Sequence, residues 1–176
     1  VGNPHQEVVQ PAAKEAGESI AISPDGRSVY TSASDPSNDG MISTFDRAAD
    51  GSLTFRGCVG NNSSQGCADL PGSPLRGAWD IAVSADGRSV YVASGLSNSL
   101  TRFERAPDGT LIYTGCLAST VVDGCTDVAG ASTPMDSTLR LAVAPDGTAL
   151  YMQGQGPSVG RVLRFSLDPQ GVPTYV

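Results

Sequence analysis

Three near-copies of one eight-residue segment recur at similar intervals along this chain of 176 residues. The copies are SPDGRSVY at 23–30, SADGRSVY at 84–91 and APDGTALY at 144–151. A repeated supersecondary unit cannot bury its apolar faces alone, so neighbouring copies stack and share a core. The repeat therefore constrains the chain to a modular fold of three similar units.

Each unit has the pattern of four short strands. In the second unit the runs DIAVS, VYVAS, SLTRFER and LIYTGC favour strands through period-2 alternation and β-branched or aromatic residues. Turn signals separate them, including two Asp-Gly pairs whose glycine accepts the positive φ of a hairpin turn. Each repeat is therefore predicted to be a four-stranded antiparallel meander.

Meanders repeated along a chain are typical of an all-β fold, the β-propeller, in which the sheets pack radially as blades. A single meander would expose both faces and be marginally stable. Residues at equivalent repeat positions are predicted to fill the space between blades. They are Ala21, Ala82, Ala142, Ile22, Val83, Val143, Tyr30, Tyr91, Tyr151, Phe45, Phe103 and Phe165.

The repeats divide the chain into a leader or linker, three blades and two connectors. The leader spans 1–17, the blades 18–60, 79–118 and 139–176, and the connectors 61–78 and 119–138. Three blades cannot close a ring and would leave large apolar faces open. We expect either further blades from a longer parent chain or self-association, with two chains giving a six-bladed ring by two-fold symmetry.

Four cysteines form two matched C-x8-C segments, one in each connector region. We predict the disulfides Cys58–Cys67 and Cys116–Cys125. A zinc site is the alternative, but zinc ligands usually come in C-x2–4-C pairs. Disulfides form in oxidising compartments, which predicts a secreted or cell-surface protein.

Charge and hydropathy exclude two classes of partner. The net charge is −7, which disfavours contact with phosphate backbones and anionic lipid. No apolar stretch is long enough to cross a bilayer. We therefore expect neither nucleic-acid binding nor membrane insertion.

The segment SADGRSVYVAS, followed by a short turn and SNSLTRFERAPDGTL, resembles the repeats of YVTN-type and lactonase-like β-propellers of bacterial secreted proteins. The resemblance covers nearly the whole chain from Glu18. Members usually have seven blades. The resemblance implies a sugar-acid lactone substrate and, in some relatives, a divalent metal held by acidic and amide side chains from several blades. No such set can be carried over to residues of this chain.

Catalytic motifs are absent from the sequence. The only histidine, His5, lies in the predicted leader, and phosphate-loop and dinucleotide signatures do not occur. We therefore assign no catalytic residue and expect no cofactor. One loop, SDPSNDG at 34–40, offers Asp35, Asn38 and Asp39 as oxygen ligands for calcium, although the spacing differs from an EF-hand.

The connectors are predicted to lie over the mouth of the central channel, a usual place for binding. Residues near the start of the first strands then form the candidate site: Arg76, Trp79, Asp80 and Arg140. Trp79 could stack on a sugar or peptide, or be wedged between blades instead, and the arginines could pair with a carboxylate.

We therefore expect a binding or scaffold module that recognises a glycan or protein through the connector face. The alternatives are a segment of a lactonase-like hydrolase and a structural subunit of a surface array or filament.

Overall fold

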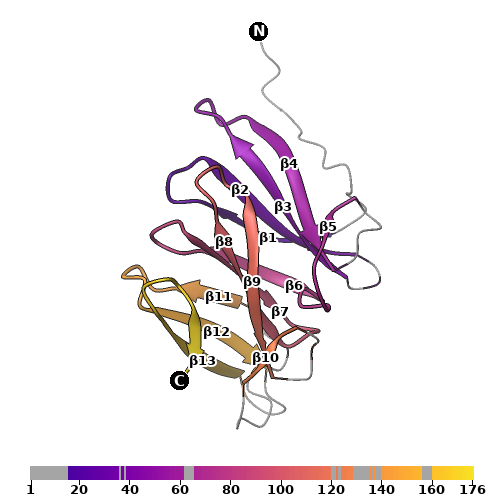
Figure 1. Cartoon of the computed structure of the whole chain (residues 1–176), viewed down its shortest axis with the longest axis vertical. Coiled ribbons are helices and arrows are strands. Elements are labelled where there is room, and N and C mark those ends of the chain that lie inside the picture. Colours follow the sequence, from indigo (N-terminus) through magenta and orange to yellow (C-terminus); the bar gives the residue numbers. More distant parts are fainter. Residues whose placement is uncertain are drawn as a thin grey trace.

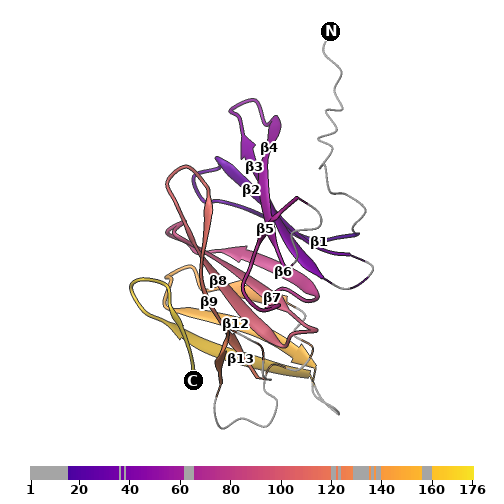
Figure 2. The same ribbon diagram turned by 45° about the vertical axis from the view of Figure 1, so that its right-hand side comes forward.

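The chain folds into three antiparallel-based sheets stacked in chain order (Figures 1 and 2). The computed structural model describes residues 16–35, 37, 39–61, 66–119, 122, 124–128, 135, 137, 140–155 and 160–176. None of these residues lies in a helix, so the predicted all-β class is confirmed.

Each sheet contains the strands of one repeat, and we call the sheets blades 1, 2 and 3. Blade 1 consists of β1 (Ala16–Ile22), β2 (Ser28–Ser34), β3 (Gly40–Arg47), β4 (Leu53–Gly60) and β5 (Ala68–Asp69). Blade 2 consists of β6 (Ala78–Val83), β7 (Ser89–Ser94), β8 (Ser99–Arg105), β9 (Leu111–Ala118) and β10 (Thr126–Asp127). Blade 3 consists of β11 (Arg140–Val143), β12 (Ala149–Gln155), β13 (Gly160–Leu167) and β14 (Pro173–Tyr175).

Blades 1 and 2 each carry a fifth strand that the sequence analysis did not predict. β5 pairs with β4 in parallel, with Val59 opposite Ala68, and β10 pairs with β9 in the same way. Both lie in the predicted connectors, directly after the second cysteine of each C-x8-C segment. Each disulfide holds the chain beside the fourth strand of its blade. The sequence did not indicate β5 and β10, because two residues are too few to show period-2 alternation.

The Asp-Gly turn between the first and second strands has the same glycine conformation in all three repeats. Gly26, Gly87 and Gly147 have φ of 69°, 72° and 71°, a left-handed conformation that disfavours residues with a Cβ. In the first turn Asp25 Oδ1 accepts hydrogen bonds from the Ser23 hydroxyl (2.6 Å) and the Arg27 amide (3.1 Å). This local bonding explains why the same residues recur in the repeat.

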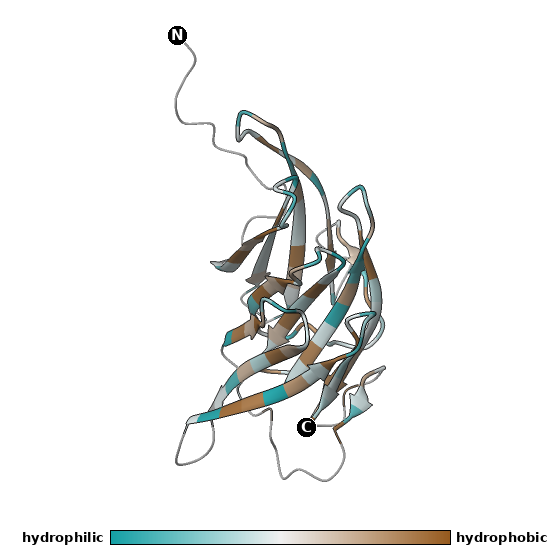
Figure 3. Cartoon of the chain, turned by 90° about the vertical axis from the view of Figure 1, so that its left-hand side faces the viewer, coloured by the Kyte–Doolittle hydropathy of each residue, from teal (hydrophilic) through white to brown (hydrophobic). Residues whose placement is uncertain are grey.

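The core lies between the blades. One large cluster joins blades 1 and 2 and includes Tyr30, Ile42 and Phe103, and a second joins blades 2 and 3 and includes Tyr91, Leu100 and Phe165. A small third cluster lies around the disulfide of blade 1. Apolar and polar bands alternate along the strands (Figure 3), as expected for strands whose neighbouring side chains point to opposite faces. Stacking of the sheets therefore buries the apolar faces that successive blades turn towards one another.

Most of the predicted inter-blade positions are buried or partly buried, and three of those on outward faces are exposed. Tyr30, Tyr91, Phe45, Phe103 and Phe165 are buried. Ile22, Ala142 and Tyr151, predicted to be core, are exposed instead. They lie on the outward faces of blades 1 and 3, which no blade of this chain covers.

Specific polar contacts also join successive blades. The Tyr30 hydroxyl donates to the carbonyl oxygen of Gly109 in the β8–β9 turn (2.8 Å), and Tyr91 donates to Gly171 in the β13–β14 turn (2.6 Å). Arg105 donates to the Tyr30 hydroxyl (2.9 Å) and pairs with Asp25 (2.9 Å). A tyrosine of one blade thus bonds to the turn between the third and fourth strands of the next blade.

Protonation of Asp25 should weaken its own turn and, to a smaller extent, its contact with Arg105 of blade 2. Hydrogen bonds from the Ser23 hydroxyl, the Arg27 amide and Arg105 lower the pKa of Asp25 from 3.8 to about 2. Because the folded pKa is depressed, the stabilisation is complete above the unfolded pKa of 3.8 and is lost as pH falls towards 2. Asp25→Asn should flatten the fall in urea-unfolding free energy across this window.

The change should be modest because Asp25 is partly exposed to solvent. Parallel acid slopes for the wild type and Asp25→Asn would show that the Asp25 carboxylate contributes nothing.

Candidate binding site at the connector face

The connector between blades 1 and 2 is attached to blade 1 at several points. The disulfide Cys58–Cys67 is present, as is Cys116–Cys125 in blade 2, and the predicted pairing is therefore confirmed. The Leu70 amide donates to Gly60 O (2.9 Å) and the Leu75 amide donates to Asn61 Oδ1 (2.9 Å). The chain is thereby directed across the end of blade 1 towards blade 2.

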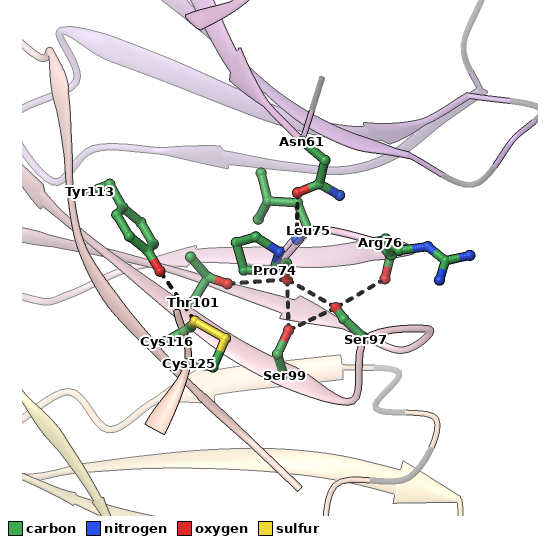
Figure 4. Close-up of a disulfide and its surroundings, with 10 residues drawn as sticks. All are labelled: Asn61, Pro74, Leu75, Arg76, Ser97, Ser99, Thr101, Tyr113, Cys116 and Cys125. Atoms are coloured by element: carbon green, nitrogen blue, oxygen red, sulfur yellow. Dashed lines mark hydrogen bonds between the residues drawn. A yellow bond between two sulfur atoms is a disulfide. The ribbon is translucent and has the colours of Figure 1, made fainter. Parts of the chain in front are cut away.

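One carbonyl group fastens the same connector to blade 2. Pro74 O accepts hydrogen bonds from Ser97 (3.0 Å), Ser99 (2.6 Å) and Thr101 (3.3 Å), as Figure 4 shows. Ser97 and Ser99 are buried, and a buried carbonyl with several donors resists displacement. The hydroxyls come from the β7–β8 hairpin, so connector and hairpin form one ordered surface.

Arg76 and Trp79 follow on this surface. The Arg76 side chain is exposed, while its carbonyl oxygen accepts the amides of Leu96 (3.1 Å) and Ser97 (3.2 Å). Trp79 is half-buried, and a Cβ added to Gly95 would collide with its ring. The indole therefore packs on the backbone of Gly95 within its own blade.

A β-bulge sets the position of Trp79. The pairing of β6 with β7 shifts register between Ala78 and Asp80, which makes Trp79 the extra residue. Blade 1 has the same irregularity between Gly17 and Ser19, where Glu18 is exposed. Bulges re-aim a side chain. This repeat position therefore presents a different residue in blades 1 and 2, at the connector end of the first strand.

Asp80 is buried and links the first strands of the three blades. We call these strands, β1, β6 and β11, the inner strands, because β6 contacts both of the others. Its Oδ1 accepts hydrogen bonds from the Ser19 hydroxyl (2.6 Å) and the Ile81 amide (3.0 Å), and its Oδ2 accepts the Leu141 amide (2.8 Å). The carboxylate thus links β1, β6 and β11. This arrangement supports a structural role, with both carboxylate oxygens occupied by donors of the chain.

The four predicted site residues all lie near the connector end of the inner strands. Asp80 contacts the residue that follows Arg140, an exposed side chain at the start of β11. Arg76 precedes Trp79 by three residues. Three clefts in the described part of the chain are lined by other residues, whereas the side chains of Arg76 and Arg140 are exposed. The predicted site is therefore a surface, and its role in binding stays a prediction.

One carboxylate of the predicted calcium loop bonds to the backbone of that loop. Asp35 Oδ1 accepts the amides of Ser37 (2.8 Å) and Asp39 (2.9 Å), while Asn38 lies outside the described residues, as does His5. Among the described residues, no group of three His, Cys, Asp or Glu side chains could hold a metal. The calcium assignment remains untested.

Two clefts at the opposite, Asp-Gly-turn end were not predicted. One, of about 550 Å³, lies between blades 1 and 2 beside Asp25, Arg47 and Arg105. The other, of about 540 Å³, lies between blades 2 and 3 beside Asp86, Asp146 and Asp168. Arginine occupies the same repeat position at 47 and 105, which was the signal available in the sequence.

The compartment follows from the cysteines. Two disulfides and no free cysteine indicate an extracytoplasmic location. Within the described residues, no helix has the length and apolar character needed to cross a bilayer.

The fold and the repeat contacts are those of part of a β-propeller. Solved lactonase-like β-propellers are similar to this chain in fold, whereas no family model and no curated protein matches it.

A proposed 6-phosphogluconolactonase from Bacteroides uniformis superposes with a TM-score of 0.59 at 20% identity, covering 93% of this chain and 40% of that one. The periplasmic gluconolactonase PpgL of Pseudomonas aeruginosa gives 0.59 at 16% identity, covering 90% and 44%. A hypothetical selenium-binding protein from Sulfolobus tokodaii gives 0.61 at 14% identity, covering 89% and 39%. This chain therefore spans less than half the length of each of these proteins. Because these proteins are named for different functions, the shared fold does not define one function.

Proposed function

We propose that this three-blade unit is a secreted or cell-surface recognition module that binds a glycan or protein through its connector face. The observation that carries the proposal is the ordered surface around Pro74. Its carbonyl group is held by three hydroxyls, and the surface presents an exposed arginine three residues before a half-buried tryptophan. A rigid surface of this kind loses little entropy on binding.

Of the two partner classes, a glycan with a carboxylate group fits the side chains better. A sugar ring can stack on an indole, and the fork of a guanidinium pairs with a planar carboxylate. Trp79 supplies the first group, and Arg76 supplies the second from a position three residues earlier.

Trp79 is the only tryptophan, so its emission reports directly on this surface. Titration with uronate-containing oligosaccharides should change Trp79 fluorescence, and neutral oligosaccharides should bind more weakly. Arg76→Ala should weaken uronate binding about tenfold, because a charge-assisted hydrogen bond contributes roughly 1.5–3 kcal/mol.

Arg88→Ala removes an exposed arginine at the opposite end of blade 2 and should leave the affinity unchanged. Equal affinities for Arg76→Ala and wild type, or no fluorescence change with any oligosaccharide, would contradict glycan recognition at this surface.

The likeness to the Bacteroides and Pseudomonas proteins favours a second candidate, a segment of a lactonase-like hydrolase. The metal found in some relatives does not fit the described residues. Asp80 is the buried acid of the inner strands, and donors of the chain already occupy both of its oxygens. The hydrolase candidate would be supported by chelator-sensitive hydrolysis of a sugar lactone, whereas the recognition proposal expects none.

A further inference from the structure

Equivalent positions of the repeat differ sharply in exposure between the inner and outer blades. Val162 is 74% exposed, whereas the residues at its position in blades 1 and 2, Ile42 and Leu100, are 0% exposed. Tyr151 is 41% exposed, and its counterparts Tyr30 and Tyr91 are 0% exposed. Figure 2 shows blade 3 at one end of the stack. Its outer face therefore carries the apolar residues of a blade–blade interface without a covering blade.

The outer face of blade 1 is open along its first strand. Ile20 is 65% exposed, whereas Ile81, its counterpart in blade 2, is 4% exposed. Ile22 is also exposed, although Phe45 on the same face is already buried and packs edge-on against Phe55. Blade 1 thus presents apolar side chains at the positions that blades 2 and 3 use to contact the preceding blade.

Polar groups on the two outer faces are complementary. Blade 3 has Asp146 and Tyr151 where blade 1 has Asp25 and Tyr30. Asp146 accepts hydrogen bonds from Thr148 of its own turn, and the Tyr151 hydroxyl has no partner among the described residues. Blade 1 has Arg47 at the position of Arg105. Arg47 is exposed at the turn end of blade 1, where it also borders the cleft with blade 2, and its side chain donates one hydrogen bond, to Gly26 O (3.2 Å).

We propose that the outer face of blade 3 binds the outer face of blade 1 in a second copy of this chain. Tyr151 would donate to Gly51 O, as Tyr30 does to Gly109, and Arg47 would pair with Asp146, as Arg105 does with Asp25. Two chains related by a two-fold axis then form both contacts at once and close a ring of six blades, within the usual range of propellers.

The choice of a second copy rests on the match between the two ends of this chain. Between blades 2 and 3, the arginine position is occupied by Leu167, so that interface lacks the Arg–Asp pair. Blade 1 supplies the arginine that blade 3's Asp146 requires. The contact between chains would thereby contain a bridge that one of the two internal interfaces lacks.

Sedimentation equilibrium of the intact, oxidised chain tests the proposal. We expect a concentration-dependent mass approaching twice 18.0 kDa and no larger species. Val162→Asp should hold the chain at the monomer mass without unfolding it, because the side chain is exposed in the monomer. Ile112→Asp alters an exposed apolar residue of the outer strand β9 and should leave the dimer intact.

A charge exchange makes the test specific. Arg47→Asp and Asp146→Arg should each weaken dimerisation at least tenfold when studied alone, with unchanged circular dichroism. When mixed, the two variants place opposite charges at both interfaces, so a heterodimer should form. A monomer at every concentration, an open polymer, or no gain on mixing would overturn the proposal.

Discussion

Replacing all four cysteines with serine should lower the free energy of unfolding by about 5 kcal/mol. Each disulfide closes a loop of about ten residues, and the chain-entropy relation gives roughly 2.7 kcal/mol for a loop of that size. The two loops belong to different blades, so their contributions should add. A loss of this size is comparable to the whole stability of many domains, about 5–15 kcal/mol.

Urea unfolding under non-reducing conditions measures this loss. Each single-bridge variant should account for about half of it, and wild type in reducing buffer should match the quadruple variant. Hydrogen exchange adds a local readout, because the amides of Leu70 and Val128 bond to Gly60 O and Ala118 O beside the disulfides. These amides should lose protection first. A combined loss below about 1 kcal/mol would show that the loops are ordered without their bridges.

Gly40→Ala should be the most damaging small substitution, with a loss of about 3 kcal/mol. A Cβ at Gly40 would overlap with the carbonyl oxygen of Leu75, and that backbone is fixed by the bond from the Leu75 amide to Asn61. Overpacking usually costs about 1–3 kcal/mol, and an immobile backbone neighbour favours the upper end.

Gly17→Ala is the matched control in the same sheet, since no atom lies within 4 Å of the Cβ position. It should change the unfolding free energy by less than about 0.5 kcal/mol. Equal stabilities of the two variants in urea unfolding would mean that the connector is free to move away from Gly40.

The repeats and the meander pattern predicted the architecture because each blade is a local structure. Every strand from β1 to β4 pairs with its neighbour in sequence, and the Asp-Gly turns specify the hairpins. β5 and β10 escaped prediction because their pairing depends on a crosslink. The exposure of Tyr151 could not be read from its repeat position, since that depends on which blade follows.

The candidate site was only partly predictable for a related reason. Position in the repeat placed Trp79 and Asp80 at the connector end of an inner strand. It could not show that Asp80 would bond to Ser19 and the Leu141 amide, because those contacts cross between blades. The Arg105–Asp25 pair likewise links residues 80 positions apart, and no local pattern reports such a contact.

Nuclear Overhauser effects between blades test most directly whether successive repeats pack face to face. We expect signals between the Tyr30 ring and the α-protons of Gly109, and between the Tyr91 ring and those of Gly171. We also expect cross-strand α-proton contacts to stay within single repeats. Main-chain contacts that pair a strand of one repeat with a strand of another would contradict this packing.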